Sequence, residues 1–322
     1  MSASAPSVTV LIPCFNTAPY LPATLKSVLQ QTSPASEIIL VDDGSSDGTL
    51  DVIREFAARH SVIKVIALAG NQGVVAARNA GLALATGDFV AMLDGDDIWT
   101  PDALALRIAL AQQYPSADLI ATDFCWFNEV LPAEPVGRIG LGPRGRARFA
   151  HSFATGEAMI LQHPFDAAAS THFVWTGATL IKRSALLAVG NFEAAFEGPE
   201  DTLLWLRLAQ RGVFVFSPKI TAFYRQRAGS LVHSQKGPKE LHYLKVLDRI
   251  RIQPEFAAHR DMISQLKAEC HHVSSLHYQH RGDFGSAVKH AAKAALLQPR
   301  NVAYWRDLAS SGSKAVISRP AK

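Results

Sequence analysis

The stretch NQGVVAARNAGLALATGDFVAMLDGDDIW, residues 71–99, decides the fold. It predicts a helix, a Gly-Asp turn and an apolar strand at 89–93 that ends in three aspartates, Asp94, Asp96 and Asp97. A buried strand that delivers carboxylates to its carboxyl end is unfavourable unless a positive charge meets them. The simplest partner is Mg2+ or Mn2+, since these cations prefer oxygen ligands and also bind phosphate. The chain is therefore a candidate for an enzyme whose substrate carries a diphosphate.

The composition is that of a folded globular protein. The chain has 322 residues, of which 48% are hydrophobic and 19% charged, enough for one large α/β domain and a smaller appendage. The formal net charge of +4 is too small an excess to indicate nucleic acid as a partner, and no basic tract is interleaved with aromatic residues.

The cysteines and the apolar runs indicate a cytoplasmic protein. Cys14, Cys125 and Cys270 lie far apart and fit neither a metal site nor a disulfide framework, which favours a reducing compartment. The apolar run at 8–12 is too short for a signal peptide, and no run approaches the ~18 residues of a membrane span. We therefore expect a cytoplasmic location, with peripheral association at the inner face of a membrane left open.

The first part of the chain alternates strand and helix patterns. Largely apolar strands are predicted at 8–12, 38–41, 62–68 and 89–93. Pro13 is expected to stop the first strand, Ser46 or Asp47 to cap the second helix, and Thr100 to cap a helix with Pro101 in its first turn. Apolar strands separated by amphipathic helices predict a parallel sheet that is covered on both faces.

Polar clusters follow three of these strands, at residues 13–16, 42–43 and 94–97. In parallel sheets the ligand binds where the carboxyl ends of the strands open into loops. We therefore expect the three clusters to face one cleft.

The later sequence is less regular. Residues 114–168 predict an irregular region with a basic run at Arg138, Arg144, Arg146 and Arg148, which is either a solvated loop or a lid that contacts phosphates or an anionic acceptor. Beyond residue 239 the pattern is helical, and residues 276–305 resemble one tetratricopeptide-like hairpin. A single such unit is expected to cap the protein or to dock a protein partner.

Four segments together resemble the family 2 glycosyltransferases of the GT-A type. They are VTVLIPCFN at 8–16, IILVDDGSSDGT at 38–49, residues 71–97, and GNFEAAFEGPEDTLLWLRLAQRG at 190–212, so the resemblance covers roughly 8–230. It implies a GT-A glycosyltransferase domain at 1–235, with a nucleotide-binding half at 1–114 and an acceptor-binding half at 115–235, followed by a helical extension at 236–322.

The resemblance also implies the reaction. A sugar moves with inversion from a nucleoside-diphosphate sugar, for which a UDP-sugar is expected, to a hydroxyl of a glycan, lipid-linked or protein acceptor. Such a reaction belongs to the synthesis of cell-surface polysaccharide or glycoconjugate.

Residues are carried over from the family motif by motif. Asp94 and Asp96 form its DxD motif and would hold Mn2+ or Mg2+, whereas Asp97 suits a turn or a helix cap. Asp42 would accept a hydrogen bond from the base, with Pro13, Phe15 and Asn16 around the nucleoside, whereas Asp43, Ser45 and Asp47 suit turn formation. Gly73 would let the backbone approach the nucleotide, and Arg78 would pair with the acidic cluster or the diphosphate.

The acidic pair Glu200 and Asp201, late in the chain, is expected on the acceptor side of the site. Asp201 would be the general base, and Glu200 would cap its helix or contact the substrate. Relatives often carry a histidine shortly after a Tyr-Arg pair, but this chain has Arg227 there. Arg227 can bind diphosphate but cannot ligate a metal, so the third protein ligand is left open, with His233 further along the chain as a candidate.

Other classes of function fit less well. A sugar nucleotidyltransferase would need a Gly-rich, basic loop after the first strand, and residues 13–16 do not provide one. A non-catalytic nucleotide-sugar binder would have little use for Asp201. Neither a dinucleotide nor a P-loop motif follows a strand. His271, His272, His277 and His280 lack a carboxylate at ligand spacing and are expected to be ordinary helix histidines.

Overall fold

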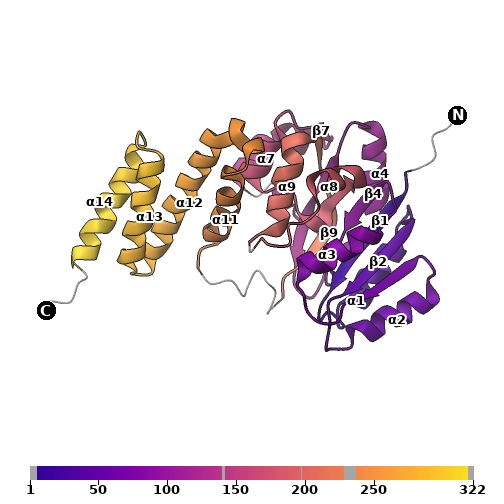
Figure 1. The fold of residues 1–322 in the computed structure, drawn as a ribbon. Helices are drawn as coiled ribbons and strands as arrows, with labels where there is room; N and C mark the ends of the chain where they lie inside the picture. The colour runs from indigo at the N-terminus through magenta and orange to yellow at the C-terminus, as the bar shows by residue number, and fades with distance from the viewer. Residues whose placement is uncertain (1–5, 140–141, 197, 228–236, 318–322) are drawn as a thin grey trace. The chain divides into compact units, whose positions relative to one another are not determined.

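The computed structural model describes residues 6–139, 142–196, 198–227 and 237–317. The chain divides into two compact units, one within residues 1–228 and one that comprises 197–199 and 229–322. The first unit is α/β and the second is helical (Figure 1).

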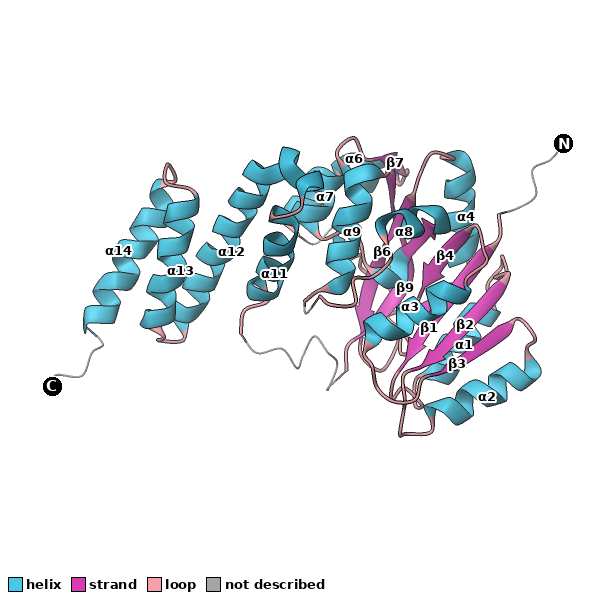
Figure 2. Ribbon diagram, viewed as in Figure 1, coloured by secondary structure: helices cyan, strands magenta, loops and turns pink. Residues whose placement is uncertain are grey.

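In the described residues of the first unit, nine strands form one sheet with the order β3-β2-β1-β4-β8-β6-β9-β5, and β7 pairs with β9 (Figure 2). Their bounds are β1 Val8–Cys14, β2 Glu37–Asp42, β3 Ile63–Ala67, β4 Phe89–Met92, β5 Ile98–Trp99, β6 Leu119–Phe127, β7 Met159–Ile160, β8 Thr179–Lys182 and β9 Phe214–Arg225. The first four strands in this order run parallel. β8 is antiparallel to both of its neighbours, and β6 is parallel to β9. The predicted α/β fold with a mostly parallel central sheet is confirmed, and the antiparallel pairs lie in its second half.

Helices cover both faces of the sheet. They are α1 Leu21–Leu29, α2 Thr49–Arg59, α3 Val74–Leu84, α4 Ala103–Gln113, α5 Pro143–Arg148, α6 Ala150–Thr155, α7 Pro164–Thr171, α8 Arg183–Val189 and α9 Glu200–Arg211, with a 3-10 turn η2 at Thr176–Ala178. Val10 and Ile12 of β1 share a core with α1, α2 and α4. Leu11 points to the other face, where α3 packs so closely that a Cβ on Gly81 would lie 2.1 Å from its Cδ1.

The strand order places the polar clusters together. β1 lies between β2 and β4, so the direction in which strands are added reverses between β1 and β4. Ligands of open α/β sheets bind at such a switch point. Here Gly95 lies against the end of β1, because a Cβ added to it would be 3.3 Å from Cys14 Sγ. Its carbonyl also accepts a hydrogen bond from Thr24 Oγ1 of α1 at 3.1 Å. The ends of β1 and β4 are therefore in direct contact.

Three predicted element boundaries are wrong. β1 continues through Pro13, which pairs with Val41 of β2, whereas β4 pairs with β1 only as far as Leu11, so that on the β4 side no ladder partner requires the missing N–H. α2 begins at Thr49 after Gly48, although Asp47 still accepts a hydrogen bond from the Thr49 N–H. α4 begins at Ala103 rather than at Pro101.

The prediction of an irregular region at 114–168 is also wrong, because this segment contains β6, α5, α6, β7 and α7. The polar residues Thr122 and Asp123 interrupt the apolar pattern of β6, yet both are buried. Asp123 Oδ1 accepts hydrogen bonds from the Phe124 and Ile139 N–H groups at 2.8 and 3.1 Å. The carboxylate thus ties the loop after β6 back onto the strand.

Replacement of Asp123 by Asn is expected to remove a pH dependence of stability. Burial raises the pKa of Asp123 to about 6 from its ordinary 3.8. The neutral carboxyl therefore stabilises the fold fully below pH ~4, and this contribution is lost as the pH rises through about 6. Relative to Asp123→Asn, the wild type should lose about 2–3 kcal/mol between these limits, as measured by urea unfolding at several pH values. Parallel profiles for the two proteins would contradict the assignment.

The second unit is helical throughout its described residues. It contains α11 Glu240–Arg251, a 3-10 segment η3 Pro254–His259, α12 Arg260–His280, α13 Phe284–Leu297 and α14 Val302–Ile317. α12 and α13 form a hairpin in which Gly282 takes φ +76° and Asp283 caps α13 through the Ser286 N–H at 3.0 Å. The likeness of this hairpin to a tetratricopeptide unit stays a prediction.

The histidines of this unit contact one another and their neighbours. His271 and His290 approach with their Nδ1 atoms 3.0 Å apart, so one ring donates to the other. Within the described residues, no three His, Cys, Asp or Glu side chains gather in a way that would hold a metal ion. No helix in the same part of the chain has the length and apolar character needed to cross a membrane.

Candidate active site

The aspartates after β4 are crowded and sheltered from water. The side chains of Asp94 and Asp96 are 32% and 14% exposed, and Asp97 is fully buried. Burial raises the pKa of Asp96, and the charge of Asp94 raises it further. Burial and the charge of Asp96 likewise raise the pKa of Asp97. The cluster therefore needs cations to remain ionised.

One of these cations is Arg78 of α3. Its Nη2 lies 3.0 Å from Asp94 Oδ1, and its Nη1 lies 2.8 Å from Glu200 Oε1. The guanidinium is nearly buried and also packs 5.2 Å from the ring centre of Phe192. A single side chain thus joins the end of β4 to the first residue of α9.

This bridge also brings Asp201 to the cluster. Asp201 follows Glu200 in the first turn of α9, and its negative charge acts on Arg78, Glu200 and Tyr224. Asp201 Oδ1 accepts a hydrogen bond from the Thr202 N–H at 2.6 Å. Burial, together with the charge of Asp201, raises the pKa of Glu200. The early acidic cluster and the late acidic pair therefore lie in one site.

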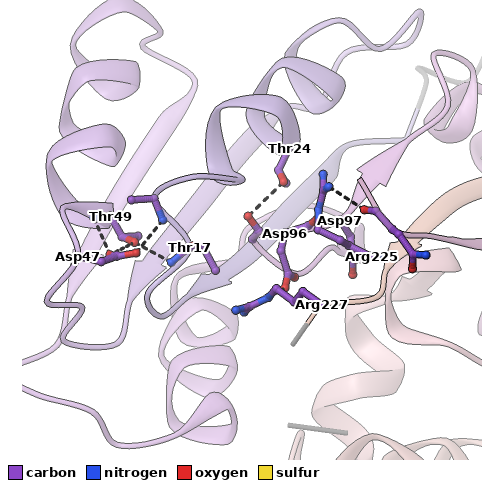
Figure 3. Close-up of polar contacts among 11 residues, drawn as sticks. Thr17, Thr24, Asp47, Thr49, Asp96, Asp97, Arg225 and Arg227 are labelled. Atoms are coloured by element: carbon purple, nitrogen blue, oxygen red, sulfur yellow. Dashed lines mark hydrogen bonds and ion pairs between the residues drawn. The ribbon is translucent and has the colours of Figure 1, made fainter. Parts of the chain in front are cut away.

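Two arginines at the end of β9 complete the charge balance (Figure 3). The Arg225 N–H donates to Asp97 Oδ1 at 2.7 Å, and its Nε donates to the Asp96 carbonyl at 2.8 Å. Arg227 Nε donates to Asp96 Oδ2 at 2.6 Å. Asp97 therefore fixes the end of β9 to the acidic turn, rather than capping the helix that follows.

At the ends of β1 and β2, a buried carboxylate oxygen has no hydrogen-bond donor among the described residues. Asp42 is 2% exposed, and its Oδ2 accepts a hydrogen bond from the Ser45 N–H at 3.2 Å. Its Oδ1 is buried without a partner in the described part of the chain. A buried carboxylate oxygen without a donor is costly, so this atom is suited to receive one from a ligand.

The neighbours of Asp42 shape the same edge. Asn16 takes φ +51°, and its Oδ1 accepts a hydrogen bond from the Ser46 N–H at 2.9 Å, so this side chain holds two loops together. Phe15 is 41% exposed, whereas Pro13 is buried. The Phe15 ring is thus the part of this segment that a nucleoside can reach.

Gly73 begins α3 in a conformation that favours glycine, with φ +89°. Its N–H and that of Gln72 donate to the Asp43 carboxylate at 2.8 and 2.7 Å. A Cβ at this position would meet nothing within 4 Å, so the space beside the backbone is open. Asp43 therefore orders the loop before α3, as expected for a structural role.

Sequence reasoning did not find the roles of Arg225 and Tyr20. The Cζ atoms of Arg225 and Arg227 lie 4.9 and 5.3 Å from the ring centre of Tyr20. The Tyr-Arg pair at 224–225 was the only signal in the sequence. His233 lies outside the described residues.

Asp94 and Asp96 are suited to supply two ligands of a divalent cation whose other ligands come from a substrate and water. Each is paired with an arginine through one oxygen, and within the described residues the second oxygen has no cationic partner. Two carboxylates cannot enclose the ion alone, and among the described residues no group of three or more His, Cys, Asp or Glu side chains that could hold a metal ion is found. Phosphate oxygens and water supply the remaining ligands in such sites.

The fold and the site define an α/β protein that carries an acidic site at the switch point of its sheet. The family described as Glycosyl transferase family 2 matches residues 9–187. The chain belongs to this family, and the resemblance found in the sequence is confirmed.

Curated relatives share parts of the chain. The putative glycosyltransferase EpsE of Bacillus subtilis is 30% identical over 65% of this chain and 69% of its own length. The putative teichuronic acid biosynthesis glycosyltransferase TuaG of the same organism is 42% identical over 32% of this chain, and the match spans 41% of TuaG. A PGL/p-HBAD biosynthesis glycosyltransferase of Mycobacterium bovis is 37% identical over 38% of this chain and 51% of its own length.

Solved structures share the fold at low identity. The S. aureus TarS 1-349 complex with UDP-GlcNAc has a TM-score of 0.66 and 17% identity, and covers 98% of this chain and 93% of that chain. The mannosyltransferase PcManGT from Pyrobaculum calidifontis, in complex with GDP-Man and Mn2+, has a TM-score of 0.60 and 20% identity, over 98% of this chain and 87% of that chain.

Proposed function

We propose that the chain transfers a sugar, with inversion, from a nucleoside-diphosphate sugar to an acceptor hydroxyl. The observation that carries the proposal is the Arg78 bridge, which links Asp94 to Glu200 and so brings Asp201 to the acidic cluster. A donor site and a general base are both needed for direct displacement, and this arrangement supplies candidates for both in one place.

The nucleoside and the diphosphate of the donor are bound by different groups of residues. Asp42 Oδ1 is the buried acceptor for an N–H of the base, and the exposed Phe15 ring and the open backbone at Gly73 lie at the same sheet edge. Asp94 and Asp96 would hold Mn2+ or Mg2+ against the diphosphate. When bound there, the cation acts as a Lewis acid that stabilises the charge developing on the leaving phosphate oxygen.

Asp201 acts on the acceptor. It takes the proton of the acceptor hydroxyl while the hydroxyl oxygen forms a bond to the anomeric carbon and the bond from that carbon to the phosphate oxygen breaks. The nucleoside diphosphate is the leaving group. Asp201 lies in the first turn of α9, where the helix N-terminus interacts favourably with a negative charge.

The curated relatives and the solved structures named above favour a particular kind of donor and product for this chain. Two relatives are described as enzymes of teichuronic acid and PGL/p-HBAD biosynthesis, which favours polysaccharide or glycoconjugate synthesis for this chain. Structures with UDP-GlcNAc and GDP-Man favour a nucleotide sugar as donor, and we retain a UDP-sugar as the expected one. Glycan, lipid-linked and protein acceptors all remain within the proposal, as does docking of a membrane surface or a partner protein.

A panel of nucleotide sugars tests the proposal. With Mn2+ present, the matching donor should raise the thermal midpoint, because ligand at about 100 times its Kd stabilises the fold by about 2.7 kcal/mol. The same donor should then release nucleoside diphosphate when acceptor is added. Release of pyrophosphate would instead indicate a nucleotidyltransferase, and binding without turnover under any acceptor would indicate a non-catalytic binder.

A further inference from the structure

We propose that Arg227 is an internal counter-ion of Asp96 that competes with the divalent cation, so that the cation and the donor diphosphate bind cooperatively. The inference rests on the proposed function, since it takes Asp96 as a ligand of the cation. The added role of Arg227 is to neutralise Asp96 in the protein that has no donor bound.

The contact itself is close and sheltered. Arg227 Nε lies 2.6 Å from Asp96 Oδ2, with the two side chains 25% and 14% exposed. A half-buried carboxylate pair is unfavourable without a cation. Arg227 thus places a positive charge on the carboxylate that would hold the metal ion.

Arg227 is held more loosely than Arg225 beside it. Arg225 is fixed by its backbone N–H to Asp97, by its Nε to the Asp96 carbonyl, and by its Nη1 to the Asn128 carbonyl at 3.2 Å. Within the described residues, the Arg227 side chain has one hydrogen-bond partner, Asp96, and one ring contact, Tyr20. Figure 3 shows the Arg227 side chain beside that of Asp96. Arg227 can therefore leave Asp96 without breaking the end of β9.

The charges determine what moves Arg227. A guanidinium on Asp96 repels a divalent cation, so the protein alone binds metal weakly. A diphosphate offers the guanidinium stronger, two-pronged hydrogen bonds than one carboxylate oxygen does. Once Arg227 turns to the diphosphate, Asp96 is released for the cation. The factor by which the diphosphate tightens metal binding then equals the factor by which metal tightens diphosphate binding.

The test is Mn2+ binding to the full chain without nucleotide, measured by electron paramagnetic resonance of free Mn2+. Arg227→Gln removes the charge and should bind Mn2+ about tenfold more tightly than the wild type, since a neighbouring charge is lost from a sheltered site. Arg227→Lys keeps the charge and should resemble the wild type. Arg183→Gln is the matched control, because Arg183 Nε binds the Gly87 carbonyl before β4, at the other end of the strand from Asp94.

A second titration with UDP and with GDP measures the coupling. Whichever of the two diphosphates binds more tightly should strengthen Mn2+ binding more in the wild type than in Arg227→Gln. Unchanged or weaker Mn2+ binding by Arg227→Gln, in a protein with a normal thermal midpoint, would overturn the inference while leaving the proposed function intact. Absence of Mn2+ binding in every protein, with or without diphosphate, would overturn both.

Discussion

The variant Asp201→Asn is expected to bind the donor as the wild type does and to lose transfer by roughly 10²–10⁴-fold, the range that general-base catalysis supplies. The amide cannot accept the proton of the acceptor hydroxyl at neutral pH. It can still accept the hydrogen bond from the Thr202 N–H through its oxygen, so the start of α9 should remain intact. Steady-state kinetics with saturating donor, together with calorimetric donor binding, separates the two effects.

Glu200→Gln is the matched control for this prediction. Its amide oxygen can still accept the hydrogen bond from Arg78 Nη1, so transfer should fall by much less than in Asp201→Asn. Wild-type turnover by Asp201→Asn would remove Asp201 from its role. An equal loss in both variants would mean that the acidic pair acts as a unit rather than through Asp201.

The variant Asp96→Ala is expected to lose metal-dependent donor binding. Removal of a carboxylate that holds the cation forfeits both the tether for the diphosphate and the stabilisation of the leaving group. A fall of roughly 10³-fold in kcat/KM, equivalent to about 4 kcal/mol, is of the size that metal assistance supplies. Calorimetry with Mn2+ and donor should show the loss directly.

Asp88→Ala is the control at the other end of β4. Asp88 Oδ2 accepts hydrogen bonds from the Ser7 N–H and hydroxyl at 2.9 and 2.8 Å, far from the acidic turn along the strand. This variant should bind the donor normally even if its stability falls. Unchanged donor affinity of Asp96→Ala in the presence of Mn2+ would contradict the metal assignment.

The sequence allowed the fold and the edge that carries the site to be predicted, because both follow from local patterns. Apolar strands at 8–12, 38–41 and 89–93 mark a covered parallel sheet, and parallel strands open their carboxyl ends on one edge. The meeting of residues 13–16, 42–43 and 94–97 at that edge followed from the topology alone.

The parts that could not be predicted depend on contacts between distant residues. β6 was missed because Thr122 and Asp123 look like loop residues, and the burial of Asp123 depends in part on a hydrogen bond from the distant Ile139 N–H. The pairing of Asp96 with Arg227, and of Asp97 with Arg225, depends on how β9 returns beside the acidic turn. The hydrophobic pattern of the sequence does not predict that the end of β9 lies beside the acidic turn.

The most direct test is diffraction at the manganese absorption edge from crystals of the full chain grown with Mn2+ and the nucleoside diphosphate that stabilises it. We predict an anomalous peak about 2.1–2.2 Å from an Asp96 carboxylate oxygen, as expected for a small divalent cation on oxygen ligands, with a diphosphate oxygen completing its coordination. A diphosphate bound elsewhere, or a peak that touches neither Asp94 nor Asp96, would contradict the proposed site.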